Sequence, residues 1–395
     1  MRADSNYTNI NKWLLPFSWL YRMGVSIRNY LFDVGVLKSR SFDIPVIAIG
    51  NLTVGGTGKT PHVEYLIRLL QDKVKVAVLS RGYKRKTQTY VLASENTPME
   101  DIGDEPYQVK HKFPDVYVAV DKDRCHGIDT LTSEPETKDV DVILLDDAFQ
   151  HRYVKPGINI LLVDYHRLII HDELLPAGRL REPLSSKARA DIVIITKCPK
   201  DLKPMEFRVM TNSMNLLAYQ ELFFTAIRYD NMKPLYGYSG KTERTLESIQ
   251  PTEQVLLLTG IASPKQMEED LQPYCKHLTH LAFRDHHDFS EKDIESINNK
   301  FAELSAPKLI ITTEKDASRL SGVEGLSDEV RQNLFVLPIK IEFLLDQEEN
   351  FTNKIISHVQ KNSRNSILVK TKDDNKPEDS YRSGDRPRTI SFRDN

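Results

Sequence analysis

The chain has 395 residues, of which 40% are hydrophobic and 28% charged, a balance typical of a folded protein with about two or three domains. Lys and Arg number 54 against 56 Asp and Glu, so no overall basic charge indicates nucleic-acid binding. The three cysteines are far apart in the sequence. Their spacing predicts neither a disulfide framework nor a zinc site, and it favours reduced thiols in a cytoplasmic setting.

Residues 1–40 form the first predicted unit, a membrane-associating amphipathic helix. Apolar side chains recur at helical spacing from Trp13 to Val34, and polar side chains from Ser18 to Asp33 fall on the opposite side. The segment carries six basic and two acidic residues, which suits a helix lying among anionic headgroups. The alternative is a helix that packs its apolar stripe on the protein's own core.

A membrane-spanning segment is not expected. No stretch reaches the roughly 18–20 uncharged apolar residues that cross a bilayer. No signal-peptide cleavage pattern follows the N-terminal segment. The sequence therefore predicts a monotopic or peripheral association with the membrane.

Short apolar runs alternate with helix-length segments, which predicts an α/β fold with a mainly parallel sheet and helices on both faces. The first series of runs is Ile44–Ile49, Val74–Leu79, Val116–Val120, Val142–Leu145, Ile158–Val163 and Ile192–Ile195. A second series predicts a smaller C-terminal α/β domain. Its runs are Val255–Leu258, His280–Phe283, Leu309–Thr312 and Leu334–Ile341.

These patterns divide the chain into four predicted parts. Residues 1–40 are the N-terminal helix, 41–225 a phosphate-loop (P-loop) domain, and 226–345 the smaller α/β domain. Residues 346–395 are a terminal helix followed by a charged tail. The tail is poor in apolar residues, and we expect it to be disordered.

A glycine-rich loop, GNLTVGGTGKT at 50–60, joins the first apolar run to a helical pattern at Pro61–Leu70. It matches the P-loop pattern, GxxxxGK followed by Ser or Thr, except that Thr53 stands at the leading glycine position. The glycines let backbone N–H groups turn toward phosphate oxygens, while Lys59 supplies charge and the Thr60 hydroxyl can ligate Mg²⁺. The predicted ATP-binding residues are Thr53, Val54, Gly55, Gly56, Thr57, Gly58, Lys59 and Thr60.

Asp146 and Asp147 end the apolar run that begins at Val142. Paired carboxylates at a strand tip repel each other unless a cation or a proton lies between them. A nucleotide bound by a P-loop carries Mg²⁺, which an acid at the end of a neighbouring strand usually holds. We therefore predict that both aspartates belong to the Mg²⁺ site.

Two departures from known nucleotide-binding patterns narrow the class of nucleotide enzyme. A guanine-specific [NT]-Lys-x-Asp pattern begins at Thr196, but Pro199 replaces the aspartate, which disfavours GTP. The partitioning ATPases carry a lysine before the first glycine pair, and here that residue is Val54. A kinase and a nucleotide-switch ATPase acting on a protein partner both stay open, and a non-enzymatic binder is a more distant third.

Further motifs accompany the P-loop. They are SRGYK at 80–84, GDEP at 103–106, LDDAFQH at 145–151, LPAGRLREP at 175–183, DHH at 285–287 and TEKD at 313–316. The set resembles the tetraacyldisaccharide 4'-kinase (lipid A 4'-kinase) family over about residues 13–345. The resemblance implies a kinase that uses ATP to phosphorylate the 4'-hydroxyl of a tetraacyldisaccharide 1-phosphate. It also implies work at the cytoplasmic face of the bacterial inner membrane.

The resemblance implies roles for individual residues as well. Asp104 is expected to be the general base, with Lys59 on the phosphates and His286 supporting Asp104 from the second domain. The residue pattern alone favours a helix cap for Asp104 and an ordinary histidine at 286. Glu182 is expected to be an outer partner of Mg²⁺. The candidate acceptor-binding residues are Arg81, Lys84, Arg124, Arg179 and Arg181.

The expected ligands and partners are ATP, Mg²⁺, the lipid A disaccharide 1-phosphate and the lipid surface of the inner membrane. We expect neither nucleic acid nor an obligate protein partner. Cys125 has no companion base in the sequence and is expected to be structural. His151 ends the LDDAFQH motif, and its role stays open.

Overall fold

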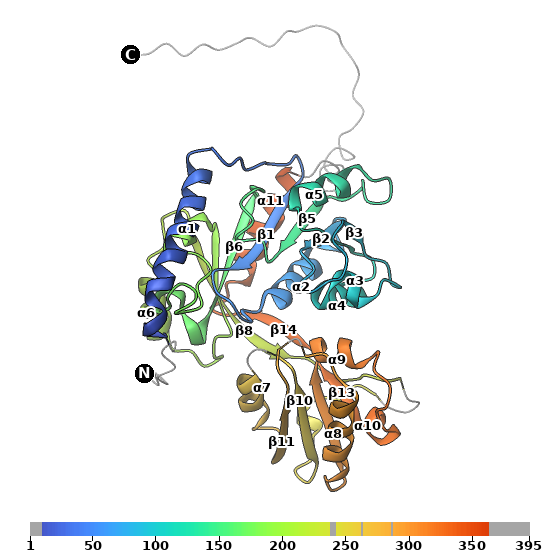
Figure 1. Cartoon of the computed structure of the whole chain (residues 1–395). Coiled ribbons are helices and arrows are strands. Elements are labelled where there is room, and N and C mark those ends of the chain that lie inside the picture. The colour runs from blue at the N-terminus through green and yellow to red at the C-terminus, as the bar shows by residue number, and fades with distance from the viewer. Residues whose placement is uncertain (1–9, 238–241, 262–263, 286, 363–395) are drawn as a thin grey trace, which may run out of the picture.

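The structure, a computed structural model, describes residues 10–237, 242–261, 264–285 and 287–362. These residues form two β-sheets flanked by helices, with the smaller sheet below the larger one in Figure 1. The predicted class, α/β with a mainly parallel sheet, is confirmed. The predicted charged tail after residue 362 and the predicted site residue His286 lie outside the described residues.

The larger sheet has nine strands within the described residues, in the order β14-β8-β7-β6-β1-β5-β2-β4-β3. The strands from β8 to β4 run parallel, and each edge strand is antiparallel to its neighbour. The central strands are continuous apolar runs because helices cover both faces of the sheet. The strands are β1 Val46–Asn51, β2 Val76–Ser80, β3 Val91–Leu92, β4 Tyr117–Val120, β5 Val142–Asp146, β6 Ile158–Asp164, β7 Ile192–Thr196, β8 Glu221–Tyr229 and β14 Ile339–Phe343.

Helices pack on both faces of this larger sheet. One face carries α2, α4 and α11, and the other carries α5 and α6. Alternate residues of β1 enter the two cores, with Ile47 and Ile49 on the first face and Val46 and Ala48 on the second. The helices are α2 Lys59–Leu70, α3 Met99–Ile102, α4 Asp104–Lys112, α5 Arg124–Ser133, α6 Pro204–Met214 and α11 Glu348–Asn362.

The smaller sheet has the order β11-β10-β12-β13-β9, with β9 antiparallel and the others parallel. Its strands are β9 Lys233–Pro234, β10 Gln254–Thr259, β11 His277–Ala282, β12 Lys308–Thr313 and β13 Leu334–Leu337. The helices of this part are α7 Pro264–Leu271, α8 Glu291–Ala302, α9 Glu314–Leu320 and α10 Asp328–Asn333. Apolar clusters lie on both faces of the sheet, so this part of the chain has its own core.

The predicted boundaries of the smaller domain, at residues 226 and 345, differ from those in the structure, because residues 226–229 continue β8 and residues 339–343 form β14 of the larger sheet. The run Leu334–Ile341 is two strands, because Pro338 has no N–H to donate and separates β13 from β14. β14 leaves the smaller sheet and pairs antiparallel with β8 at the edge of the larger sheet. The smaller domain is thus inserted between β8 and β14. We call residues 231–337 the inserted domain and the remaining described residues from 41 onward the nucleotide domain.

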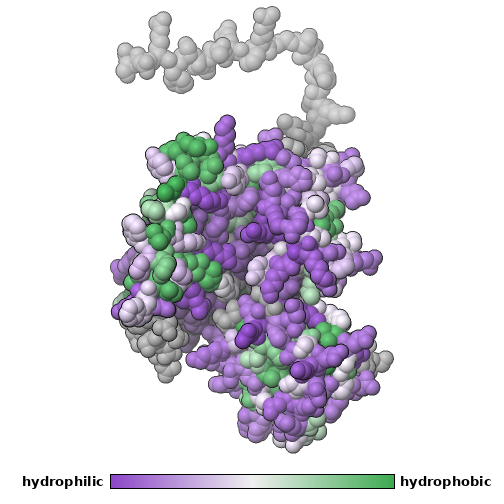
Figure 2. Space-filling view, viewed as in Figure 1, coloured by the Kyte–Doolittle hydropathy of each residue, from purple (hydrophilic) through white to green (hydrophobic). Residues whose placement is uncertain are grey.

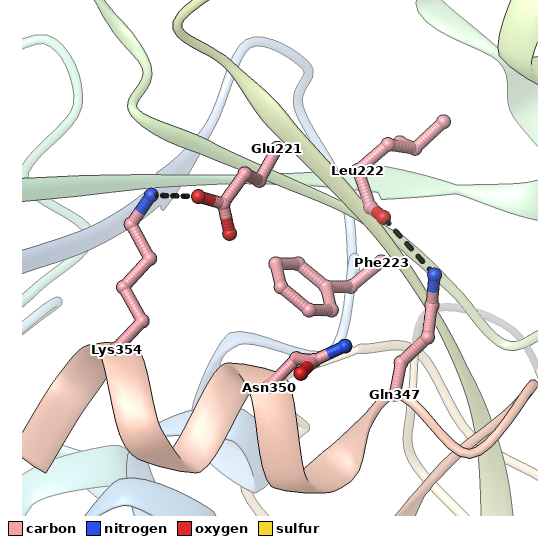
Figure 3. Close-up of a pocket in the computed structure, with 6 residues that line it drawn as sticks. All are labelled: Glu221, Leu222, Phe223, Gln347, Asn350 and Lys354. Carbon is pink, nitrogen blue, oxygen red and sulfur yellow. Dashed lines mark hydrogen bonds and ion pairs between the residues drawn. The ribbon is translucent and has the colours of Figure 1, made fainter.

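The predicted terminal helix completes the nucleotide domain. Phe351, Ile355 and Val359 of α11 are buried in the same core as α2. The first residues of β8 and one side of α11 line a surface hollow of about 530 Å³ (Figure 3). Lys354 pairs with Glu221 across this hollow. It contains none of the predicted site residues.

The N-terminal segment forms a helix, α1 Leu15–Asp33, that lies against the nucleotide domain through a mixed face that includes Ser18, Tyr21 and Phe32. The Ser18 hydroxyl donates to the carbonyl of Leu174 at 2.9 Å, and the Tyr21 hydroxyl donates to the carbonyl of Arg181 at 2.9 Å. Only Ser18 and Phe32 are buried among the α1 residues. Of the predicted polar side, Ser18 and Asn29 take part in this contact, whereas Arg22 and Ser26 are exposed.

The apolar stripe of α1 faces outward, so the core-packing alternative is wrong. Trp13 is 91% exposed, Phe17 59% and Ile27 53%. Figure 2 shows green patches along α1, separated by paler and purple residues. No helix among the described residues has the length and apolar character needed to cross a bilayer.

Candidate active site

The P-loop connects β1 to α2, which begins at Lys59. Gly55 and Gly58 have φ angles of 114° and 83°, which glycine adopts without strain. The first N–H groups of α2 have no partners within the helix, and together with the helix dipole they attract an anion. The segment therefore has the local geometry of a phosphate site.

Buried polar contacts hold the P-loop in place. The Asn51 side-chain amide donates to the Thr57 hydroxyl at 2.8 Å, and the Thr196 hydroxyl donates to the Thr57 carbonyl at 3.0 Å. The backbone N–H of Val54 donates to the carbonyl of Arg179 at 2.9 Å. The LPAGRLREP segment thus pairs with the P-loop and brings its arginines beside it.

Two residues beside the P-loop were missed as site residues. His62 is buried, with Nδ1 2.7 Å from the carbonyl oxygen of Gly58 and Nε2 3.1 Å from the Thr225 hydroxyl. Burial lowers the pKa of His62 to about 4, so this imidazole is neutral at neutral pH. Lys197 donates to Asp164 at 2.6 Å and to the carbonyl of Gly56. The sequence signal that could have identified Lys197 is its place after Thr196 in the partial [NT]-Lys-x-Asp pattern.

Asp146 and Asp147 lie at the carboxyl end of β5, next to the strand that leads into the P-loop. Asp147 Oδ1 is 3.5 Å from Lys59 Nζ, and Asp147 Oδ2 is 3.2 Å from an Arg181 nitrogen. Asp147 has a φ of 47°, a strained conformation for a residue with a side chain. The structure therefore brings the predicted lysine, both predicted acids and one predicted arginine into one cluster.

The two neighbouring carboxylates differ in charge state. Burial, together with the nearby carboxylates of Glu105 and Asp147, raises the pKa of Asp146 to about 7. Burial acts in the same direction on Asp147, but the charges of Lys59 and Arg181 outweigh it and lower the pKa. Asp147 is ionised at neutral pH. Asp146 is only partly ionised near pH 7, and a bound cation would favour its ionised form.

Two buried carboxylate oxygens fit the predicted Mg²⁺ site. Among the described residues, Asp146 Oδ1 and Glu182 Oε1 are buried without a hydrogen-bond partner. The other oxygen of Glu182 pairs with Arg189. Buried acceptors are normally satisfied, and oxygen ligands with coordinated water are what Mg²⁺ prefers. The donor set of Thr60, Asp146, Asp147 and Glu182 is therefore compatible with a hydrated Mg²⁺ ion.

Asp104 is the first residue of α4, and the helix cap is Gly103. Gly103 has a φ of 90°, and a Cβ there would lie 2.8 Å from the carbonyl oxygen of Tyr83. The GDEP motif thus packs on the SRGYK loop, and only glycine fits at its first position. Asp104 forms an ion pair with Arg319 of the inserted domain. The simple helix-cap interpretation of Asp104 is therefore wrong.

The second-domain motif is described only in part. His286 lies outside the described residues, so its predicted place across from Asp104 stays a prediction. The adjacent His287 has Nε2 3.0 Å from Asp293 and stacks on Phe283. These contacts give His287 a place in the packing of the inserted domain.

The predicted acceptor-binding residues have different surroundings. Arg81, Lys84 and Arg179 are exposed on the loops around the site. Arg181 pairs with Asp147, as described above. Arg124 is 2% exposed and donates to the carbonyl oxygens of Asp121 at 3.0 Å and Asp146 at 3.4 Å. This burial argues against direct contact between Arg124 and the acceptor, because its donors face the protein interior.

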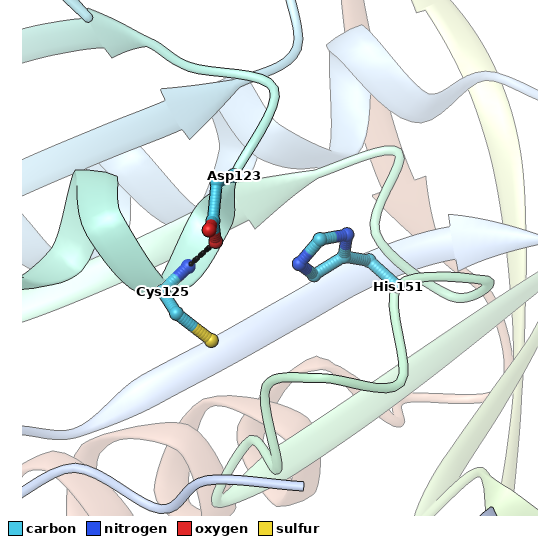
Figure 4. A group of neighbouring side chains, drawn as sticks. All are labelled: Asp123, Cys125 and His151. Atoms are coloured by element: carbon cyan, nitrogen blue, oxygen red, sulfur yellow. Dashed lines mark hydrogen bonds between the residues drawn. The ribbon is translucent and has the colours of Figure 1, made fainter. Parts of the chain in front are cut away.

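His151 lies beside the start of α5. Its ring is turned toward Asp123 and Cys125, whose ligand-type atoms lie within 4.8 Å of it and of each other (Figure 4). The sequence spacing did not indicate this grouping. Asp123 Oδ1 accepts from the backbone N–H groups of Cys125 at 2.9 Å and His126 at 3.3 Å, which makes Asp123 the cap of α5.

The comparison with known proteins agrees with the motif set. A model of the tetraacyldisaccharide-1-P 4'-kinase family matches residues 10–360. The tetraacyldisaccharide 4'-kinase of Phocaeicola vulgatus is 55% identical over 364 residues, covering 92% of this chain and 99% of the relative. That of Porphyromonas gingivalis W83 is 44% identical over 356 residues, covering 89% of this chain and 98% of the relative.

A solved structure is similar over most of its length. The crystal structure of LpxK from Aquifex aeolicus in complex with ATP has a TM-score of 0.68 and 30% sequence identity. The match covers 88% of this chain and 99% of that chain. From the sequence relatives, the fold and the assembled motifs, the chain belongs to the tetraacyldisaccharide 4'-kinase family.

Proposed function

We propose that the chain phosphorylates the 4'-hydroxyl of a tetraacyldisaccharide 1-phosphate with ATP. The observation that carries this is a convergence at the carboxyl edge of the parallel sheet. Lys59 follows β1, Asp147 follows β5, and the α4 start with Asp104 packs on the loop after β2. Ligand sites of open α/β sheets lie at this edge. A phosphate site and an acidic residue for an acceptor hydroxyl thus meet in one place.

Each group has a role in the transfer. Lys59 and the N–H groups at the α2 start hold the β- and γ-phosphates. The oxygen of the sugar hydroxyl bonds to the γ-phosphorus while Asp104 accepts the hydroxyl proton. ADP leaves with the electrons of the broken P–O bond. Because this transition state is loose, positioning and charge neutralisation contribute most of the rate. The support that His286 gives to Asp104 is part of the proposal.

Mg²⁺ would neutralise charge on the transferring phosphate. Thr60, Asp146 and Asp147 are the proposed residues around the ion, with Glu182 in the outer shell. The orphaned oxygens of Asp146 and Glu182 support this assignment. Lys59 and Arg181 beside Asp147 also keep that carboxylate ionised for the cation.

The acceptor would reach the site from a lipid surface. The outward apolar stripe of α1 supports docking at the cytoplasmic face of the inner membrane, where acyl chains can stay in lipid. Arg81, Lys84 and Arg179 are exposed cations for the acceptor or the nucleotide. The exposed stripe of α1 therefore supports the proposed membrane docking, and the loop cations support the proposed binding of the acceptor.

A transfer assay tests the proposed function. Purified protein is incubated with radiolabelled ATP, Mg²⁺ and detergent-solubilised disaccharide monophosphate, and the product is identified by mass spectrometry. We expect one phosphate added at the 4'-position, and Asp104→Asn should lower kcat by about 10²–10⁴. The control Asp115→Asn, at an exposed residue of the loop after α4, should keep the rate. Acceptor-independent ATP hydrolysis without lipid product would refute the proposal.

A further inference from the structure

Arg319 joins the inserted domain to the start of α4. It lies on α9, and its side chain is only 3% exposed. Its Nε donates to Asp104 Oδ2 at 3.1 Å, and its Nη2 donates to the same oxygen. Charge-assisted bonds from a planar guanidinium are directional. The contact therefore constrains the orientation of the Asp104 carboxylate.

A second carboxylate, that of Asp316, holds the Arg319 guanidinium on the side of the inserted domain. Asp316 is fully buried and accepts from Arg319 Nη1 at 3.2 Å, from the N–H of Gly260 at 2.8 Å and from the Thr313 hydroxyl at 2.7 Å. The Gly260 carbonyl also accepts from Nη1 at 3.4 Å. A Cβ at Gly260 would lie 2.8 Å from Asp316 Oδ1, so the packing needs glycine. The inserted domain thus holds Arg319 in a fixed orientation.

Two other ion pairs cross the same contact between α4 and α9. Lys112 pairs with Glu314, and Glu105 lies 3.9 Å from Lys315. The four side chains are 17–25% exposed, compared with 3% for Arg319 and 21% for Asp104. Arg319 is therefore more shielded from water than Lys112 or Lys315, although its partner carboxylate is not. Arg319 also places two donors on one Asp104 oxygen and is itself held by Asp316, so it constrains orientation more than either lysine does.

We propose that Arg319 is a positioning residue for phosphoryl transfer, which holds the Asp104 carboxylate oriented and ionised while the two domains are docked. This inference rests on the proposed role of Asp104 as the base. Asp104 belongs to the nucleotide domain and Arg319 to the inserted domain. Docking of the domains therefore completes the arrangement around the base.

Kinetics of two Arg319 variants test the inference. Arg319→Met removes the charge, and Arg319→Gln combined with Asp316→Asn removes it without leaving Asp316 as an unpaired buried charge. In both, kcat should fall by about 10²-fold, the cost of a misplaced group, with the KM for ATP nearly unchanged. The acid limb of the pH–rate profile should move up by about one pH unit or more, because a nearby cation favours an ionised carboxylate.

The control is Glu314→Gln, which removes an ion pair between the domains without touching Asp104 and leaves Lys112 paired with the buried Glu64. It should keep the wild-type kcat and pH profile. Folding is checked by circular dichroism and thermal melting, and the paired variant carries the test if Arg319→Met does not fold. The double variant of Arg319→Met with Asp104→Asn should lose less than the product of the single losses.

Two results separate the inference from the proposed function. Wild-type kcat and pH profile in either folded Arg319 variant, with Asp104→Asn inactive, would overturn the positioning role alone. Wild-type kcat in Asp104→Asn would overturn the proposed base itself. An effect of Arg319→Met on KM only, or strictly additive losses in the double variant, would also contradict the positioning role.

Discussion

Lys59 faces the proposed phosphate site from the first residue of α2, with Asp147 3.5 Å from its amine. Lys59→Ala removes the charge that holds the β- and γ-phosphates, and we expect kcat to fall by about 10²–10³. Phosphoryl transfer from labelled ATP measures the loss. Lys73→Ala changes an exposed lysine beyond the end of the same helix and is the matched control. A folded Lys59→Ala protein with near-normal transfer would refute the phosphate-site assignment.

Asp146 links pH to Mg²⁺ binding. Its pKa is about 7 in the folded protein and 3.8 as a free side chain, so the folded state favours the protonated form. Mg²⁺ needs the ionised form, so apparent Mg²⁺ affinity should weaken as pH falls through about 7. Mg²⁺ titrations of the transfer rate across this range measure the effect. Asp146→Asn should raise the Mg²⁺ requirement and abolish this pH dependence.

The raised pKa of Asp146 also makes stability depend on pH: stability should fall as pH rises, whereas Mg²⁺ affinity should increase. A carboxyl whose folded pKa is raised destabilises the fold when ionised, and this cost is fully present above pH 7 and relieved as pH falls below it. Without Mg²⁺, Asp146→Asn should therefore raise Tm above pH 7 and have a smaller effect at lower pH. Thermal melts at several pH values measure this, with exposed Asp72→Asn as the control. An unchanged Tm at high pH would contradict the raised pKa.

At the scale of elements, α1 is expected to dock on lipid through its outward stripe. Phe17→Asp with Ile27→Asp replaces two exposed apolar side chains and leaves the anchoring Ser18 and Phe32 in place. Burying one such side chain contributes about 1.5–3 kcal/mol. Binding to phosphatidylglycerol vesicles should therefore drop by about tenfold or more, as measured by co-sedimentation. Activity should fall more on the lipid acceptor than on a soluble short-chain analogue.

The control for α1 is Leu217→Asp with Leu345→Asp, which adds the same charge at two exposed apolar residues outside the helix. It should leave vesicle binding unchanged. Equal vesicle binding by the wild-type protein and the α1 variant would show that the stripe has no part in lipid docking.

At the scale of the whole molecule, the inserted domain leaves and re-enters the larger sheet at one place. The N–H of Asp230 donates to the carbonyl of Pro338 at 2.9 Å, so the two ends of the insertion are adjacent. Replacing residues 231–337 with an Asn-Gly turn should let β8 and β14 close as a hairpin. The shortened protein should fold and bind an ATP analogue, but it should not transfer phosphate, because Arg319 and the proposed supporting residue His286 are both removed.

Calorimetric titration with the analogue, circular dichroism and the transfer assay check this expectation. An unfolded shortened protein would show that the nucleotide domain depends on the insertion for its core. Retained transfer would show that no residue of the insertion is needed for the chemistry.

The local parts of this protein could be predicted from the sequence. The P-loop is contiguous, and its glycines, Lys59 and Thr60 function at fixed spacing, so the residues themselves determine the phosphate site. The buried parallel strands are short apolar runs of adjacent residues. The family resemblance identified Asp104, whose local pattern alone favoured a helix cap.

Only the tertiary structure decided which distant segments meet. The sequence did not show that β14 returns to β8, because apolar alternation marks a strand but not its partner. It did not show that Arg319 meets Asp104, which is 215 residues away. The outward direction of the α1 stripe was equally undetermined, since the helical period gives a face but not what that face contacts. Contacts between distant residues depend on how the completed elements pack, and no local pattern encodes that.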